Sequence, residues 1–483
     1  MGAKPRSTIR ITSSVYMTPI ASALADWALN LSFSDLPDDV VRATRLRILD
    51  VIGLALAGGE TPFGRGTRQA ALAMAPGGLA RIWGAGDRVG LGAAALTNAS
   101  CAQALEFDDT HNESIVHMSS PAVAAGLALA DTRRVSGREL IAAVAVANEI
   151  SCRAGSVASG QFHKRGLHPT GLFAPFGVTA LAARLLATDS PALAHAFGVC
   201  GSFASGVLEC WVDGTQSKFL HSGWAAQSGI AAALLAQAGV SGPPRVFEGR
   251  FGLFASHLQD PDVPRNFGRL TDALGSHWES RNSSFKPYPA AHVLHPYIDA
   301  VLRARREHAI VPSDVERIDC PVAAFIVPIV CEPVEEKVAP ATQAHGRVCL
   351  QYTIAEALSL GALGRTAYES YDDPAIRALA RRVHYHVDPD YPGPGRFKGA
   401  VHITLRDGRR IDVVQEHNLG SPENPMSEAA LRAKFDDNAS AALDASQRER
   451  LADVIADVER LDDVSVIGAL TIRDNTKSTK NDL

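Results

Sequence analysis

Apolar residues in the first half of the chain recur at the spacing of amphipathic and buried helices. Between residues 20 and 31, for example, Leu24, Trp27 and Leu31 share one face. The same periodicity predicts a helix from Pro37 that Gly58-Gly59 ends, and further helices at about 65–75, 91–107, 121–131, 137–155, 171–187, 190–200 and 218–239. Most of these segments are apolar nearly all round and rich in Ala and Gly, which is typical of helices inside a helical core or at a subunit interface.

The pattern changes at about residue 275, where Pro and β-branched residues become frequent. Strands are predicted at 315–321, 324–331 and 383–387, with a hairpin at 399–414 whose turn contains Asp407-Gly408. Helices at about 290–308 and 350–360 interrupt this region, and a helical pattern returns after Pro425 with Ser427 and Glu428 at its start. We therefore predict a mainly α protein: a large all-helical domain (1–274), a smaller inserted α+β domain (275–424), and C-terminal helices (425–483) that return to the helical domain.

Composition narrows the class of protein. Of 483 residues, 46% are hydrophobic and 20% charged, a globular composition, and the net charge of −5 comes without a basic stripe, which argues against nucleic acid as a partner. The seven cysteines form no CxxC pair, and five lie in apolar runs (Cys101, Cys152, Cys200, Cys210 and Cys349), so we expect buried free thiols in a reducing cytoplasm. The polar stretch 1–10 lacks the core of a signal peptide, and no apolar run reaches the length of a membrane span.

An acidic segment carries the first candidate chemistry. Glu106-Phe107-Asp108-Asp109-Thr110-His111 follows an alanine-rich apolar helix, and His117 comes soon after it. Burying so many charges without partners costs several kcal/mol each, so the segment is either solvated or lines a polar cavity. Glu106 and Asp109 share a face if the helix continues that far.

Two further segments place a reactive group beside glycine or proline. His168 precedes a proline in GLHPTG, which disfavours helical backbone at the histidine, and Thr170 is suited to cap the next helix. Lys218 and His221 are three residues apart near a helix start and together suit a substrate carboxylate. Taken singly, each has a structural or solvated interpretation that is favoured over the functional one.

Two segments of the second half complete the set. Lys286 lies in a stiff Lys-Pro-Tyr-Pro stretch followed by His292 and His295, and Tyr352 begins an apolar helix, where a tyrosine is more often a core residue than a catalyst.

Three common chemistries lack their motifs. Residues 84–90 have the wrong spacing for a dinucleotide turn, the acidic segment lacks metal-ligand spacing, and there is no G-x-S-x-G elbow.

Six segments in this order resemble the MmgE/PrpD family over nearly the whole chain: LRILDVIGLALAG, ALEFDDTH, GLHPTG, KFLHSGWAAQSGIAAALLAQAG, KPYPAAHVLHPYIDA and LRDGRRIDVV. The resemblance implies a helical domain with a smaller α+β lid, an active site between them, a homodimer, and no metal or organic cofactor. It also implies a small polycarboxylate substrate, since the family includes enzymes that dehydrate 2-methylcitrate, decarboxylate cis-aconitate or epimerise iminodisuccinate.

The resemblance assigns site residues one at a time. The first acid of the family's DFDDT run falls on Glu106, where this chain has Glu in place of Asp, and its threonine falls on Thr110. The remaining matches are His117, after a one-residue length difference, His168, Lys218, Lys286, one of His292 or His295, and Tyr352.

These assignments suggest a mechanism. Lys218, with His221 and Lys286, forms a cationic clamp for an enediolate-like charge. His168 and His117 act as base and acid in an order left open, Tyr352 protonates a leaving hydroxyl, and Glu106 or Asp109 orients a histidine. We predict a cofactor-independent lyase, of the hydro-lyase type, on a small di- or tricarboxylate. An epimerase or decarboxylase is the alternative within enzymes, and a non-catalytic carboxylate-binding protein is the alternative of another class.

Overall fold

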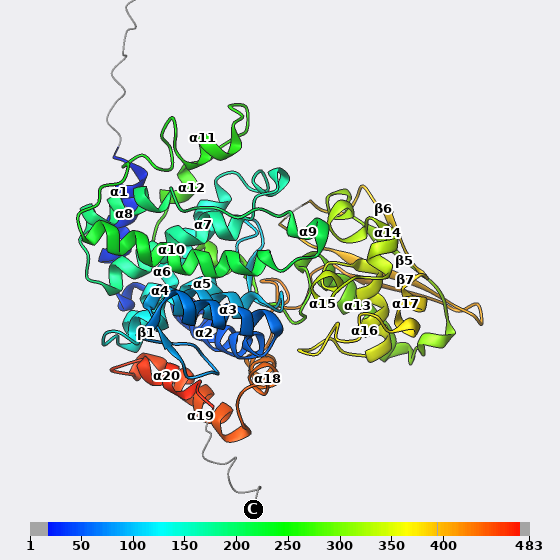
Figure 1. Cartoon of the computed structure of the whole chain (residues 1–483). Helices are drawn as coiled ribbons and strands as arrows, with labels where there is room; N and C mark the ends of the chain where they lie inside the picture. Colours follow the sequence, from blue (N-terminus) through cyan, green and yellow to red (C-terminus); the bar gives the residue numbers. More distant parts are fainter. Residues whose placement is uncertain (1–17, 394, 474–483) are drawn as a thin grey trace, which may run out of the picture.

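The computed structural model describes residues 18–393 and 395–473 and shows a helical part beside a smaller part that contains a sheet (Figure 1). This confirms the predicted mainly α class. The helical part contains α1 (Ile20–Asn30), α2 (Asp38–Gly59), α3 (Pro62–Met74), α4 (Leu91–Gln103), α5 (Ser119–Ala130), α6 (Gly137–Ser156), α7 (Pro169–Leu185), α8 (Ser190–Cys200) and α10 (Leu220–Gln237), joined by α18 (Glu428–Ala439), α19 (Ala445–Ala456) and α20 (Ser465–Leu470). The predicted absence of a signal peptide in 1–10, and the polar last ten residues, lie outside the described residues.

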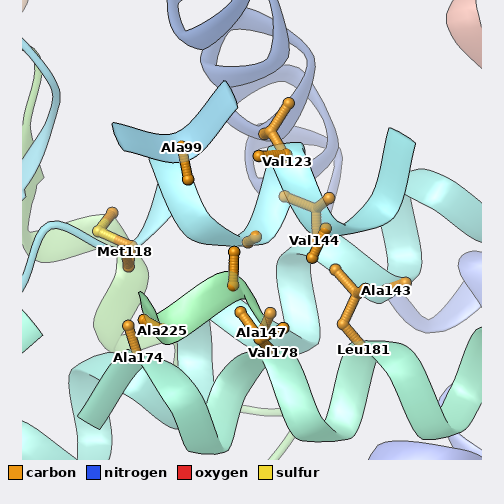
Figure 2. Close-up of a cluster of buried hydrophobic side chains, with 14 of the residues drawn as sticks. Ala99, Met118, Val123, Ala143, Val144, Ala147, Ala174, Val178, Leu181 and Ala225 are labelled. Atoms are coloured by element: carbon orange, nitrogen blue, oxygen red, sulfur yellow. The ribbon is translucent and has the colours of Figure 1, made fainter. Parts of the chain in front are cut away.

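Small side chains let the central helices approach one another closely. Helices α4, α5, α6, α7 and α10 meet around residues such as Ala99, Ala147, Ala174 and Ala225 (Figure 2). A side chain at Gly223 of α10 would lie 2.4 Å from the Leu96 carbonyl oxygen of α4, so the two helices touch at their backbones. This close packing fixes the start of α10, which carries His221 and directly follows the 3₁₀ turn Ser217–Phe219 that carries Lys218.

The second part has its own hydrophobic core, built from residues between Ala290 and Val413. Its four-stranded sheet has the order β6 (Val383–Val387), β5 (Val315–Val322), β7 (Gly399–Leu405), β8 (Arg410–Gln415), with β5 and β6 parallel and the other pairs antiparallel. Helices α13 (His295–His308), α14 (Val334–Val338), α15 (Gln343–Gly346), α16 (Leu350–Leu360) and α17 (Pro374–Ala380) complete it. The β7–β8 hairpin forms around Asp407-Gly408, as its sequence predicts.

The chain passes from the helical core into the second core and then returns to the helical core. The first core uses residues from Ala21 to Trp278 and again from Phe435 to Ile467, and the second lies between these stretches. Helices α18 to α20, red and orange in Figure 1, thus rejoin the blue-to-green helical part. Ser427 caps α18 by accepting a hydrogen bond from the Ala430 amide, at the predicted start.

One predicted strand is wrong. Residues 324–331 form a 3₁₀ turn (Ala324–Ile326) and a π-helical turn (Val327–Cys331). The β-branched run suggested a strand, but Pro328 cannot donate to a strand ladder and is tolerated at a helix start. The seven cysteines are buried free thiols, as predicted. No helix among the described residues is both long and apolar enough to span a bilayer.

The connection between the two parts is anchored on α6. The Glu149 carboxylate accepts hydrogen bonds from the amides of Glu279 and Ser280, at 2.9 and 3.0 Å. The chain then forms β4 (Ser283–Ser284), which pairs with β3 (Thr110–His111). This pairing lays the acidic segment beside the chain that leads to Lys286.

Glu279 gives this connection a pH dependence. The facing His111 ring and then Arg269 outweigh burial and lower the pKa of Glu279 to about 2. A depressed pKa stabilises the fold above the unfolded-state pKa of a glutamate, about 4.3, and this stabilisation is lost as the pH falls toward 2. We expect the free energy of unfolding, measured by urea titration between pH 5 and 2, to fall less for Glu279→Gln than for the wild type. Glu369→Gln, at an exposed carboxylate, is the control that keeps the wild-type slope. A wild-type slope in Glu279→Gln would contradict the assignment.

Candidate active site

A cavity of about 1200 Å³ is lined by residues of both parts of the molecule. Seven predicted site residues line it: Glu106, Thr110, His117, His168, Lys218, Lys286 and His292. They come from four of the five segments that the sequence singled out, so the fold gathers residues that lie up to 186 positions apart.

The acidic segment reaches the cavity through an unusual backbone. Helix α4 ends at Gln103, and Glu106 adopts a left-handed φ of 56°. The predicted shared face of Glu106 and Asp109 required the helix to continue to Asp109, so this shared face does not form. Three buried cations each donate to one carbonyl oxygen after the helix: Arg347 to Ala104 at 3.1 Å, Lys286 to Glu106 at 3.0 Å, and Lys434 to Phe107 at 2.8 Å. Buried carbonyl oxygens outside regular structure need hydrogen-bond donors, and these three cations supply them.

The Glu106 carboxylate is the counter-ion of the lysines. It forms an ion pair with Lys218, lies 3.6 Å from the Lys286 ammonium and lies 4.0 Å from His117 Nε2. Burial alone would raise the pKa of Glu106, but Lys218, Lys286 and His117 together lower it well below its usual range. Two lysines thus share one carboxylate, and an anionic substrate finds cationic charge available.

His117 is held by its Nδ1 atom. This nitrogen lies 3.0 Å from the Asp109 carbonyl oxygen, 3.2 Å from Thr110 Oγ1 and 3.3 Å from Asp108 Oδ1. A carbonyl oxygen can only accept a hydrogen bond, so we place a proton on Nδ1 of His117, which donates it to the Asp109 carbonyl. The other ring nitrogen, Nε2, faces the Glu106 carboxylate. Carboxylates thus flank both ring nitrogens, an arrangement that stabilises an imidazolium when one forms.

His168 is the N-cap of α7 and has the extended backbone expected before a proline, with φ −83° and ψ 114°. Its Nδ1 lies 3.0 Å from His221 Nδ1, while its buried Nε2 has no protein partner among the described residues. Burial, and then the Lys218 charge, lower the pKa of His168 well below its usual value, so the ring is neutral. The rings of His117 and His168 lie 5.7 Å apart between centroids. The cavity wall therefore contains two neighbouring imidazoles and two lysines that share the Glu106 carboxylate.

Comparison with known proteins identifies the family of this chain. Sequence models of the MmgE/PrpD N-terminal and C-terminal domains match residues 22–266 and 288–460. This chain belongs to the MmgE/PrpD family. It is 28% identical to a cis-aconitate decarboxylase of Aspergillus terreus over 92% of this chain and 94% of that protein. It is 27% identical to the cis-aconitate decarboxylase of Mus musculus (93% of each) and 26% identical to that of Homo sapiens (93% and 94%).

Some predicted residues of this MmgE/PrpD protein lie behind the cavity wall. Asp109 pairs with Arg47 at 3.2 Å and accepts a hydrogen bond from Ser119 Oγ at 2.5 Å, and burial raises its pKa. His221 contacts the cavity residue His168. His292 lines the cavity, whereas His295 does not. The Nε2 atom of His295 instead donates to the Ala290 carbonyl oxygen at 3.2 Å. Asp109, His221 and His295 thus lie outside the cavity lining, next to residues that form it.

Tyr352 does not lie with the site. Its side chain is buried in the second core, where its hydroxyl donates to the Ser370 carbonyl oxygen at 2.6 Å. It is absent from the cavity lining, and burial raises the pKa of the phenol. We therefore remove Tyr352 from the proposed catalytic set. Thr170 also differs from expectation, since its hydroxyl accepts the His117 amide at 2.9 Å instead of capping α7.

Sequence reasoning missed several functional neighbours. Asp108, next to two acids that we singled out, is the carboxylate that approaches His117. Arg47, Arg347 and Lys434, which hold the acidic segment, lie far from it in sequence. Arg47 belongs to the LRILDVIGLALAG segment, but the resemblance assigned no role to any of the three. Within 18–393 and 395–473, no group of three or more His, Cys, Asp or Glu side chains is arranged to hold a metal ion.

Proposed function

We propose that this MmgE/PrpD enzyme is a lyase that breaks a bond to carbon in a small polycarboxylate, with decarboxylation of an unsaturated tricarboxylate as its leading reaction. The observation that carries the proposal is the meeting of His117 and His168 with Lys218 and Lys286 in one cavity. The relatives named above shift our preference from dehydration, which the sequence favoured, to decarboxylation.

Decarboxylation fits the residues at hand. In cis-aconitate the carboxylate on the CH₂ carbon leaves as CO₂, and its bonding electrons form a new double bond. The old double-bond electrons move to the far CH carbon, which lies next to a carboxylate and takes one proton. The trianion and one proton thus give a dianion and CO₂. This needs one proton donor and cations beside the developing charge, whereas dehydration also needs an acid for the leaving hydroxyl, the role that Tyr352 no longer fills.

Each residue then has a part in the step. Lys218 and Lys286 stabilise the carboxylate on which charge develops, an effect worth about two to three orders of magnitude per group in other enzymes. The neutral His168, with its proton on the unpartnered Nε2, donates that proton to the carbon. His221 Nδ1–H then supplies a proton to His168 Nδ1, and the partly exposed His221 regains one from water, so that both rings end neutral. His117, fixed by Asp109 and Thr110, orients the substrate and supports proton transfer.

The test is turnover in D₂O with cis-aconitate, citrate and 2-methylcitrate as substrates. We expect CO₂ from cis-aconitate and one deuterium in the product at the carbon next to a carboxylate. Loss of water without CO₂ would assign a hydro-lyase, and deuterium exchange without net reaction an epimerase. Ligand-dependent thermal stabilisation without turnover or exchange would assign the non-catalytic carboxylate-binding protein and overturn the lyase. The expected homodimer and the absence of a cofactor remain predictions.

A further inference from the structure

Lys337 is a buried cation in the cavity wall without a counter-ion. It belongs to the short helix α14 of the second part, lines the cavity and is 2% exposed. Its ammonium makes no ion pair and no hydrogen bond with any side chain or carbonyl in the described stretches of the chain. No motif of the sequence drew attention to it.

The other buried lysines near the cavity are compensated. Lys218 and Lys286 lie beside the Glu106 carboxylate, and Lys434 lies 2.8 Å from Asp50 Oδ1. A buried ammonium is strongly disfavoured unless it is paired, so Lys337 is the exception that needs a partner.

The groups around Lys337 do not supply that partner. Glu336 also lines the cavity, but it is exposed and forms no ion pair with Lys337 within the described residues. The Glu332 carboxylate accepts hydrogen bonds from the Tyr385 hydroxyl and from the Val334 amide at 2.9 Å. Burial and then the Lys337 charge lower the pKa of His345, so this ring is neutral and adds no charge.

We propose that Lys337 binds a carboxylate of the substrate that is remote from the reacting carbon, and that it selects tricarboxylates over dicarboxylates. This assignment rests on the proposed function. Lys218 and His168 belong to the helical part and Lys337 to the second part, so a bound tricarboxylate bridges the two parts. Both cationic positions line the same cavity of about 1200 Å³.

The experiment measures binding by calorimetry to full-length protein. The ligands are propane-1,2,3-tricarboxylate, which lacks the double bond and the hydroxyl, and two dicarboxylates, glutarate and methylsuccinate, that each lack one carboxylate of it. We expect Lys337→Met to raise the Kd for the tricarboxylate roughly 30-fold or more. For at least one dicarboxylate the Kd should stay within about twofold of the wild type. Lys337→Arg should keep most of the selectivity, and Lys398→Met, at a lysine paired with Glu416 outside the cavity, is the matched control.

Folding of the variant is checked separately. Replacing an unpaired buried ammonium by a side chain of similar length removes a desolvation cost, so the Tm of ligand-free Lys337→Met should equal or exceed that of the wild type. Equal weakening for all three ligands, an unchanged tricarboxylate Kd, or no tricarboxylate binding by the wild type would overturn the inference. Binding with the expected selectivity but without turnover would instead overturn only the lyase assignment.

Discussion

His168→Ala is expected to lower kcat by roughly two to four orders of magnitude, the usual contribution of a positioned proton-transfer group. The imidazole has a buried Nε2 without a protein partner, faces the cavity with Lys218, and is backed by His221 at 3.0 Å. Steady-state decarboxylation with cis-aconitate measures the effect, and the Tm shows that the variant folds.

The matched control is His257→Gln. His257 is a half-buried histidine of the helical part whose Nδ1 donates to the Leu253 carbonyl oxygen outside the cavity. It should keep the wild-type kcat. His117→Ala should also be slow, and the double variant with His168→Ala should be little slower than either single variant, because groups that act in one step are not additive. A kcat for His168→Ala close to that of the wild type would remove His168 from the mechanism.

The largest expected effect on stability comes from Arg153→Met. Arg153 of α6 is fully buried, binds Glu149 at 2.6 Å and donates to the carbonyl oxygens of Arg269, Asp272 and His277 at 2.7 to 2.9 Å. Its removal leaves the buried Glu149 charge without a cation and frees three carbonyls. Breaking such a pair costs about 3–5 kcal/mol of unfolding free energy. Urea titration followed by near-UV circular dichroism measures this loss.

Two further variants separate pairing from packing. Arg165→Met, at an arginine 3.4 Å from Asp260 on the surface, should cost about 1 kcal/mol or less. Glu149→Met combined with Arg153→Met should recover part of the loss, because no buried charge then lacks a partner. A loss for Arg153→Met as small as that of Arg165→Met would show that the connection between the two parts does not depend on this ion pair.

The strained Glu106 backbone links stability to function. A left-handed conformation costs a non-glycine residue about 1–3 kcal/mol and persists where its surroundings fix it. Here Lys286 and Lys434 hold the carbonyls of Glu106 and of Phe107, the next residue, and Lys286 also faces the Glu106 carboxylate. The charges that shape the segment thus also set the electrostatics of the cavity.

The sequence by itself determined the helices, the hairpin and much of the site. Helical periodicity placed α8 and α16 at the observed residues, and Asp407-Gly408 fixed the hairpin, because both signals depend on neighbours within a few positions. The proline after His168 fixed its extended backbone for the same local reason. The resemblance then selected seven residues that line one cavity.

Only the tertiary structure decided which of the predicted side chains line the cavity and what surrounds them. Asp108 and Asp109 are adjacent acids, yet one approaches His117 and the other pairs with Arg47, a choice made by the turn at Glu106. Tyr352 lies in the second core, and Lys337 is buried without a counter-ion. Burial and pairing depend on contacts between separate segments, such as that of Arg47 with Asp109, and the local spacing of residue types carries no record of those contacts.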